Sequence, residues 1–149
     1  MIRPRQISIS VISALLILLF SYAAINKILD YHKFSGQLKS SPLVRPVAEI
    51  LTWLIPSAEL YAIVLLLVRD WRRNGMMLSA VLMALFTIYI SLMLIFSKKL
   101  PCSCGGVIDQ LTWTQHLIFN FVFLALAATG FILQKSEDLF AIEQEKPKT

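Results

Sequence analysis

Charged residues are scarce in this 149-residue chain. Asp, Glu, Lys and Arg together make up 15% of it, whereas 57% of its residues are hydrophobic. A soluble domain of this size needs a polar surface, which this composition cannot supply. The hydrophobic residues also occur in long runs, which are typical of a chain solvated by lipid. The scarcity of charge therefore excludes a soluble globular protein and predicts an integral membrane protein.

Cysteine is scarce as well, and the chain has no basic stripe of the kind that binds nucleic acid. Two cysteines are too few for a disulfide scaffold, although they are enough for one redox pair or for half of a metal site. The formal charge of +5 comes from Lys and Arg residues scattered between the hydrophobic runs. This distribution excludes nucleic acid as a partner and predicts contact with the lipid bilayer and its anionic headgroups.

Four hydrophobic segments are long enough to cross a membrane. They cover about residues 7–25, 47–68, 76–96 and 113–133. Each holds about 20 residues, the helical length that crosses roughly 30 Å of hydrocarbon. Lipid offers no partner for free backbone groups, so these segments must be helices. We predict an all-α, integral membrane four-helix bundle over residues 1–133, followed by a loosely ordered polar cytoplasmic tail at 134–149.

The first segment has a competing interpretation as a cleavable signal peptide. Arg3 and Arg5 precede its hydrophobic core, and Ser-Tyr-Ala at residues 21–23 resembles a cleavage site. The hydrophobic core is long for a signal peptide, so we predict that it is retained as a span.

The orientation in the membrane follows from the shortest loop. Residues 69–73, Arg-Asp-Trp-Arg-Arg, link the second and third spans, and short arginine-rich loops resist translocation. We therefore predict a multi-pass protein of the bacterial inner membrane with both termini in the cytoplasm. The cysteine-bearing loop then lies in the periplasm, an oxidising compartment.

The two cysteines form a Cys-x-Cys pair in the loop before the last span. Pro101 ends the third span, and Gly105 and Gly106 follow the pair. Cys102 and Cys104 point to the same side of an extended segment, so they can form a small, strained disulfide, and such disulfides exchange readily. A redox-active pair is favoured over two alternatives. One is a thiolate site for copper or zinc, which lacks further ligands nearby. The other is an inert, structural pair.

Two ionisable residues within or near the spans are candidates for function. Glu59 lies near mid-bilayer in the second span, and Lys27 lies at the outer end of the first. Glu59 could donate a structural hydrogen bond as a neutral acid, accept a proton, or form an ion pair with Lys27. Lys27 could instead extend to the membrane interface without a functional partner. The sequence leaves these alternatives open.

The start of the last span carries a histidine and an asparagine on one helix face. Thr112 and Gln115 form a capping-box pattern that predicts where this helix begins. His116 and Asn120 are four residues apart, so they share a face close to the cysteine loop. His116 could accept a proton from a thiol or orient a quinone carbonyl. For both residues the alternative is a hydrogen bond between helices.

These residues together resemble the MauE/DoxX group of redox-associated membrane proteins, over about residues 13–133. The matching motifs are Phe20, Ala23 and Lys27 in the first span; Pro56, Glu59 and Leu60 in the second; Pro-Cys-Ser-Cys-Gly-Gly at 101–106; and Leu-Thr-Trp at 111–113 with His116 and Asn120. The resemblance implies a bundle similar in architecture to the membrane enzymes that oxidise thiols and pass electrons to quinone. It makes quinone the candidate cofactor, with Lys27, Glu59 and Asn120 as candidate binding residues.

One departure from the quinone-linked thiol oxidases limits what the chain can do alone. Those enzymes carry a second cysteine pair in an external loop, whereas this chain has only Cys102 and Cys104. A relay would need cysteines from a partner, such as a thioredoxin-like protein. We predict a membrane thiol–disulfide redox protein that uses these cysteines and His116 to support disulfide formation or electron transfer with such a partner. The alternatives are a non-enzymatic scaffold or assembly subunit and a thiolate copper carrier.

Overall fold

The fold is that of a computed structural model, which describes residues 4–96 and 112–145, without the side chains of residues 113 and 145. All regular structure in these two ranges is helical. The helices are α1 (Pro4–Leu29), α2 (Tyr31–Ser40), α3 (Ala48–Leu67), α4 (Arg72–Phe96) and α5 (Trp113–Glu145), with short 3₁₀ turns η1 (Arg45–Val47) and η2 (Arg69–Trp71).

Four of these helical segments are long and apolar enough to cross a membrane. They are Pro4–Leu29, Arg45–Leu67, Arg69–Phe96 and Thr114–Gln144. They coincide with the four segments expected from the sequence, so the predicted all-α fold with four spans is confirmed. The chain is accordingly a multi-pass membrane protein, whose spans imply a lipid bilayer around it.

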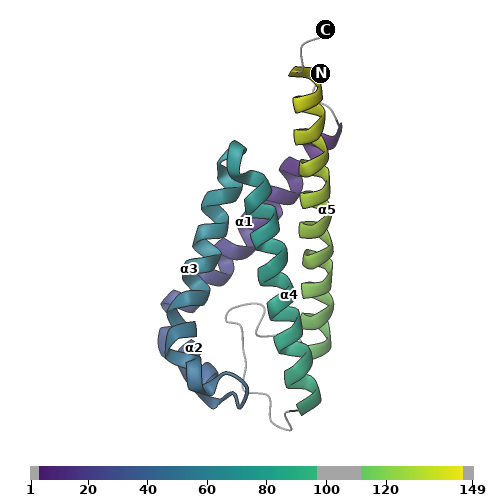
Figure 1. The fold of residues 1–149 in the computed structure, drawn as a ribbon. Helices are drawn as coiled ribbons and strands as arrows, with labels where there is room; N and C mark the ends of the chain where they lie inside the picture. The colour runs from purple at the N-terminus through teal and green to yellow at the C-terminus, as the bar shows by residue number, and fades with distance from the viewer. Residues whose placement is uncertain (1–3, 97–111, 146–149) are drawn as a thin grey trace.

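The four long helices run up and down around a shared core. Helix α1 packs against α3 and α5, and α4 packs against the same two helices from the other side. Figure 1 shows η2 at the same end of the bundle as the start of α1 and the end of α5, and α2 at the opposite end, where α4 ends and α5 begins. We call these the η2 end and the α2 end.

The core is apolar, whereas the outward faces of the helices remain exposed. Leu16 and Phe20 of α1, Leu66 of α3 and Met83 of α4 are almost completely buried. Outward residues of the same helices, such as Leu18, are largely exposed in the isolated chain. Lipid covers such residues in a membrane, so their exposure fits a spanning bundle.

The η2 end is held together by two close helix contacts at glycines. A Cβ on Gly75 of α4 would lie 2.8 Å from the backbone nitrogen of Leu66 in α3. A Cβ on Gly130 of α5 would lie 2.8 Å from Met76 Sδ and 3.0 Å from a methyl carbon of Ile12. Any larger residue at either position would force neighbouring atoms to move, so the absence of a side chain sets how closely these helices approach.

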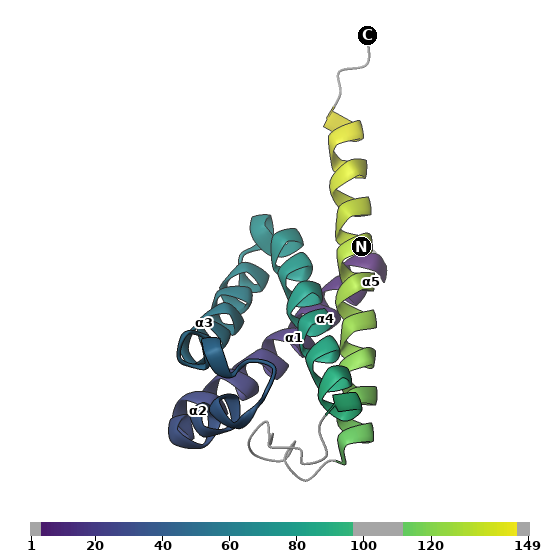
Figure 2. The same cartoon turned by 60° about the horizontal axis from the view of Figure 1, so that its bottom comes forward.

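Two helical segments differ from the sequence-based expectation. Residues 31–40 lie between the first two predicted spans, where no helix was predicted, but they form α2, which packs on α3 through the rings of Tyr31 and Trp53 at 5.3 Å. Helix α5 continues to Glu145 and projects past the η2 end (Figure 2). The expectation of a loosely ordered tail was therefore wrong for residues 134–145. The cytoplasmic location of this tail stays a prediction.

Beyond the predicted span, α5 contacts α1 and α4. Arg5 donates a hydrogen bond to Ser136 at 3.5 Å and lies 5.5 Å from the ring of Phe140. Arg73 lies 4.0 Å from the Asp138 carboxylate. These pairings are long-range in sequence, so composition alone did not reveal them.

Candidate functional site

The polar centre of the bundle is an ion pair between α1 and α3. Lys27 Nζ lies 2.7 Å from Glu59 Oε1, and the two side chains are 10% and 0% exposed. A charged side chain at such a depth is costly unless a partner of opposite charge compensates it. The structure thus contains the ion pair that was one of the alternatives for these residues, and Lys27 does not extend away to the interface.

Two aromatic rings flank the Lys27 ammonium group. Its nitrogen lies 5.8 Å from the ring centre of Phe34 in α2 and 5.7 Å from that of Phe86 in α4. Both distances are within the range of cation–π attraction. The ammonium is therefore held by one carboxylate and two ring faces, which come from three different helices.

A cavity of about 520 Å³ adjoins this ion pair. All five α-helices contribute to its wall, which is mostly aliphatic and aromatic. Its polar residues are Lys27, Gln37, Glu59, Tyr89, His116 and Asn120. Sites for small organic molecules in proteins have this character, with volumes of about 300–1,000 Å³ and a few polar groups in an apolar wall.

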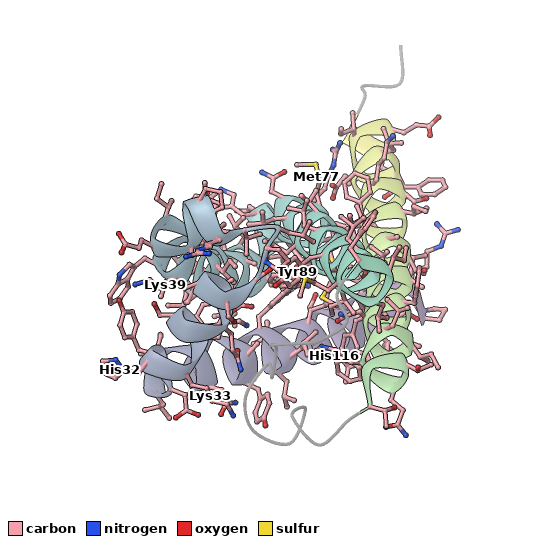
Figure 3. The ribbon with its side chains drawn as sticks, turned by 90° about the horizontal axis from the view of Figure 1, so that it is seen from below. His32, Lys33, Lys39, Met77, Tyr89 and His116 are labelled. Carbon is pink, nitrogen blue, oxygen red and sulfur yellow. The ribbon has the colours of Figure 1, made fainter. Side chains whose placement is uncertain are left out.

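The cavity brings together four of the six residues that were predicted as site residues. Lys27, Glu59, His116 and Asn120 all line it. Asn120 is buried, whereas His116, one helical turn closer to the start of α5, is partly exposed. Figure 3, viewed from the α2 end, shows His116 and Tyr89 toward the interior and His32 at the periphery.

Two buried polar atoms in the cavity residues lack a hydrogen-bond partner within the described part of the chain. They are Glu59 Oε2, an acceptor, and Asn120 Nδ2, a donor. Buried polar atoms are paired in the great majority of cases, because leaving one unpaired costs about 1–3 kcal/mol. Each atom therefore needs a hydrogen-bond partner that the described residues do not supply.

The wall of the cavity at the α2 end is fixed by a short hydrogen-bonded chain. Tyr89 donates to Ser41 Oγ at 3.0 Å, and the Ser41 hydroxyl donates to Met93 Sδ at 3.5 Å. Ser41 directly follows α2 and is fully buried. These contacts tie the end of α2 to α4, and they place Gln37 and Leu38 of α2 against the cavity.

The predicted cysteines, Cys102 and Cys104, lie outside the described residues. The segment 97–111 that carries them joins Phe96, the last residue of α4, to Thr112, which precedes α5. Thr112 N donates to Gln115 Oε1 at 3.0 Å and Gln115 N donates to Thr112 Oγ1 at 3.4 Å, which confirms the predicted capping box. Phe96 and Thr112, the described residues on either side of this segment, lie at the α2 end, where His116 also lies.

Sequence reasoning missed the aromatic residues of the site. Phe34 and Leu38 are four apart in α2, a spacing that indicates one apolar helix face and could have shown that this segment packs inward. Phe86 and Tyr89 stand in the third span, which is mostly hydrophobic, and nothing in its sequence marks these two rings as residues that line a cavity. Across residues 4–96 and 112–145, no three His, Cys, Asp or Glu side chains form a cluster that could hold a metal ion.

Comparison with known families adds one match. The family model for the methylamine utilisation protein MauE matches residues 5–133. The matched range contains the core of all four spans, the Cys-x-Cys pair of the sequence and the four predicted site residues that line the cavity. No curated protein and no solved structure gives a significant match.

Proposed function

The chain belongs to the MauE family of multi-pass membrane proteins, and from this premise we propose that it is a thiol–disulfide redox protein of methylamine utilisation. Cys102 and Cys104 would cycle between dithiol and disulfide. As a disulfide, the pair takes two electrons and two protons from a dithiol of a partner protein, which becomes a disulfide. A thioredoxin-like or other cysteine-containing protein on the periplasmic side is the partner that fits this exchange.

The observation that carries the proposal is the position of His116. This residue lines the cavity one turn into α5, at the end of the bundle where α4 ends and α5 begins, and the chain between these two helices carries Cys102 and Cys104. Thiolate is the reactive form in disulfide exchange, so a nearby base promotes the reaction. We assign to His116 the role of accepting and returning the thiol proton.

Reoxidation of the cysteines needs an electron acceptor, for which a membrane quinone is the proposed class. The balanced step converts the dithiol and one quinone into one disulfide and one hydroquinone. Two S–H bonds break and one S–S bond forms, while two O–H bonds form on the quinone oxygens. The mostly apolar cavity lined by His116 has a volume of about 520 Å³, which is in the range of sites for small organic molecules. This volume and lining support a quinone as the electron acceptor.

Alkylation trapping in native membranes tests the proposed function. The fraction of Cys102 and Cys104 blocked by a thiol alkylator should rise on addition of reductant and fall on addition of quinone. A Cys102→Ser variant should accumulate a mixed disulfide between Cys104 and its partner. A pair that never changes state would refute the redox role.

The same variants separate the redox role from a scaffold role. A chain with both Cys102→Ser and Cys104→Ser should lose the ability to support growth on methylamine if the pair is redox-active. Full growth of this variant would instead identify the protein as a non-enzymatic assembly subunit.

A further inference from the structure

The two unpaired atoms in the cavity differ in what they require. Glu59 Oε2 belongs to a carboxylate whose other oxygen binds Lys27, so this atom needs a hydrogen-bond donor. Asn120 Nδ2 needs an acceptor. They do not bond each other, although both residues line the same cavity. A single ligand that satisfies both must carry a donor and an acceptor at its polar end.

The charge of the site restricts the ligand further. The Lys27 ammonium and the Glu59 carboxylate compensate each other, and two aromatic rings also contact the ammonium. No cation in the pair is left to attract a phosphate or carboxylate group. The other polar residues of the wall, Gln37, Tyr89, His116 and Asn120, carry no carboxylate or ammonium group, and the rest of the wall is apolar. These features favour a neutral, lipid-soluble molecule over an anionic lipid headgroup.

The shape of the wall favours a flat ring. Phe34, Phe86, Phe119 and Tyr89 line the cavity from three helices, and aromatic faces pack well on other rings. A ring that carries two hydroxyl groups offers an O–H donor and an oxygen acceptor at its polar edge.

We infer that the cavity binds a lipid-soluble hydroquinone, with Glu59 Oε2 accepting a hydrogen bond from one ring hydroxyl and Asn120 Nδ2 donating to a ring oxygen. The inference rests on the proposed function, because it assigns the reduced product of the electron acceptor to this site. The oxidised quinone has only acceptors. Its carbonyl oxygens cannot satisfy Glu59 Oε2, so the site selects the reduced form.

This selection has a consequence for the direction of the redox step. A site that binds hydroquinone more tightly than quinone stabilises the product of cysteine oxidation. By mass action it draws the exchange toward the disulfide. The ion pair and Asn120 thus act on the cysteines through the ligand.

Binding to a cysteine-free chain tests the inference without any redox turnover. The chain carrying Cys102→Ser and Cys104→Ser would be placed in lipid nanodiscs and titrated anaerobically, by equilibrium binding, with three probes. These are tetramethylhydroquinone, its dimethyl ether and tetramethylquinone, which share one ring. The hydroquinone should bind about tenfold more tightly than the other two, since only it has O–H donors. Equal affinities, or no binding of the hydroquinone, would overturn the inference.

Two variants test whether Asn120 donates the proposed hydrogen bond to the ligand. Asn120→Leu removes the donor without disturbing the ion pair, and it should weaken binding of all three probes by about tenfold. Thr87→Val is the matched control, because Thr87 is buried, bonds its own helix at Met83 O and does not line the cavity. Its binding should be unchanged. If Asn120→Leu leaves the affinities unaltered while the chain stays folded, the assignment of Asn120 is wrong.

The outcomes distinguish this inference from the proposed function. The binding experiment uses a chain that cannot form a disulfide, and alkylation trapping uses the unaltered cysteines. Redox-active cysteines without hydroquinone selection would refute only the inference. Should Asn120→Leu fail to fold, the comparison of the three probes on the otherwise unaltered bundle still decides it.

Discussion

Breaking the Lys27–Glu59 pair one partner at a time should destabilise the bundle far more than removing both charges. The two charged atoms lie 2.7 Å apart, and Glu59 has no exposed surface. A Lys27→Met substitution leaves a fully buried carboxylate without its cation, and we expect a loss of about 3–5 kcal/mol in the free energy of unfolding. The double variant Lys27→Met, Glu59→Leu has no charge to desolvate and should recover most of this loss.

A double-mutant cycle in mixed micelles measures the coupling. The four chains are unfolded by titration with a denaturing detergent, and helix content is followed by circular dichroism. The single variants should sum to a loss that exceeds that of the double variant by about 3 kcal/mol or more. The ion pair between Lys39 and Glu49 is the matched control. Lys39 Nζ lies 3.4 Å from Glu49 Oε1, but the two side chains are 53% and 85% exposed. Its coupling should be within about 1 kcal/mol of zero.

Additive losses at Lys27 and Glu59 would refute this reasoning. Additivity means that the two charges do not compensate each other, as would hold if Lys27 extended to the membrane interface. A small loss for Lys27→Met alone would have the same meaning. In either case the two charges beside the cavity would not compensate each other, and the cavity would not be electrically neutral.

Three further predictions concern the helix contacts and the orientation. Gly75→Ala should lower the free energy of unfolding by about 1–3 kcal/mol, since the added Cβ would lie 2.8 Å from the α3 backbone. Gly36→Ala is the control, because its Cβ would have no neighbour within 4 Å, and it should be neutral or slightly stabilising. Unfolding curves in denaturing detergent compare the two variants. Thr112→Ala should cost about 1 kcal/mol by removing the α5 cap, and the same curves measure it. In a cysteine-free chain in intact cells, Ser40→Cys should react with an impermeant thiol reagent and Glu143→Cys should not, and the reverse result would invert the predicted orientation.

The four spans could be predicted from the sequence because each is a property of a single segment. Length and hydrophobicity decide whether a helix crosses a membrane, and both are local. The capping box at Thr112 and Gln115 is local too, and the structure contains it with both hydrogen bonds. The ion pair could be proposed only as one alternative, since the sequence shows that Lys27 and Glu59 need partners without showing that they meet.

The rest of the site depends on contacts between distant segments. Helix α2 was missed because residues 31–40 have mixed composition, and its inward face became evident only from Phe34 and Leu38 against the cavity. The extension of α5 was missed because its partners, Arg5 and Arg73, are far away in the sequence. No pattern in the third span marks Phe86 as a residue that contacts the Lys27 ammonium.

The location of the cavity follows from how closely the helices pack at the opposite end. At Gly75, α4 touches the α3 backbone, and at Gly130, α5 lies against Met76 of α4 and Ile12 of α1. From their contact at the η2 end, α3 and α4 diverge toward the α2 end (Figure 1). Large side chains such as Phe86 fill this widening space only in part, and about 520 Å³ remains. The close contacts at the two glycines of the η2 end therefore set how far the cavity opens at the α2 end.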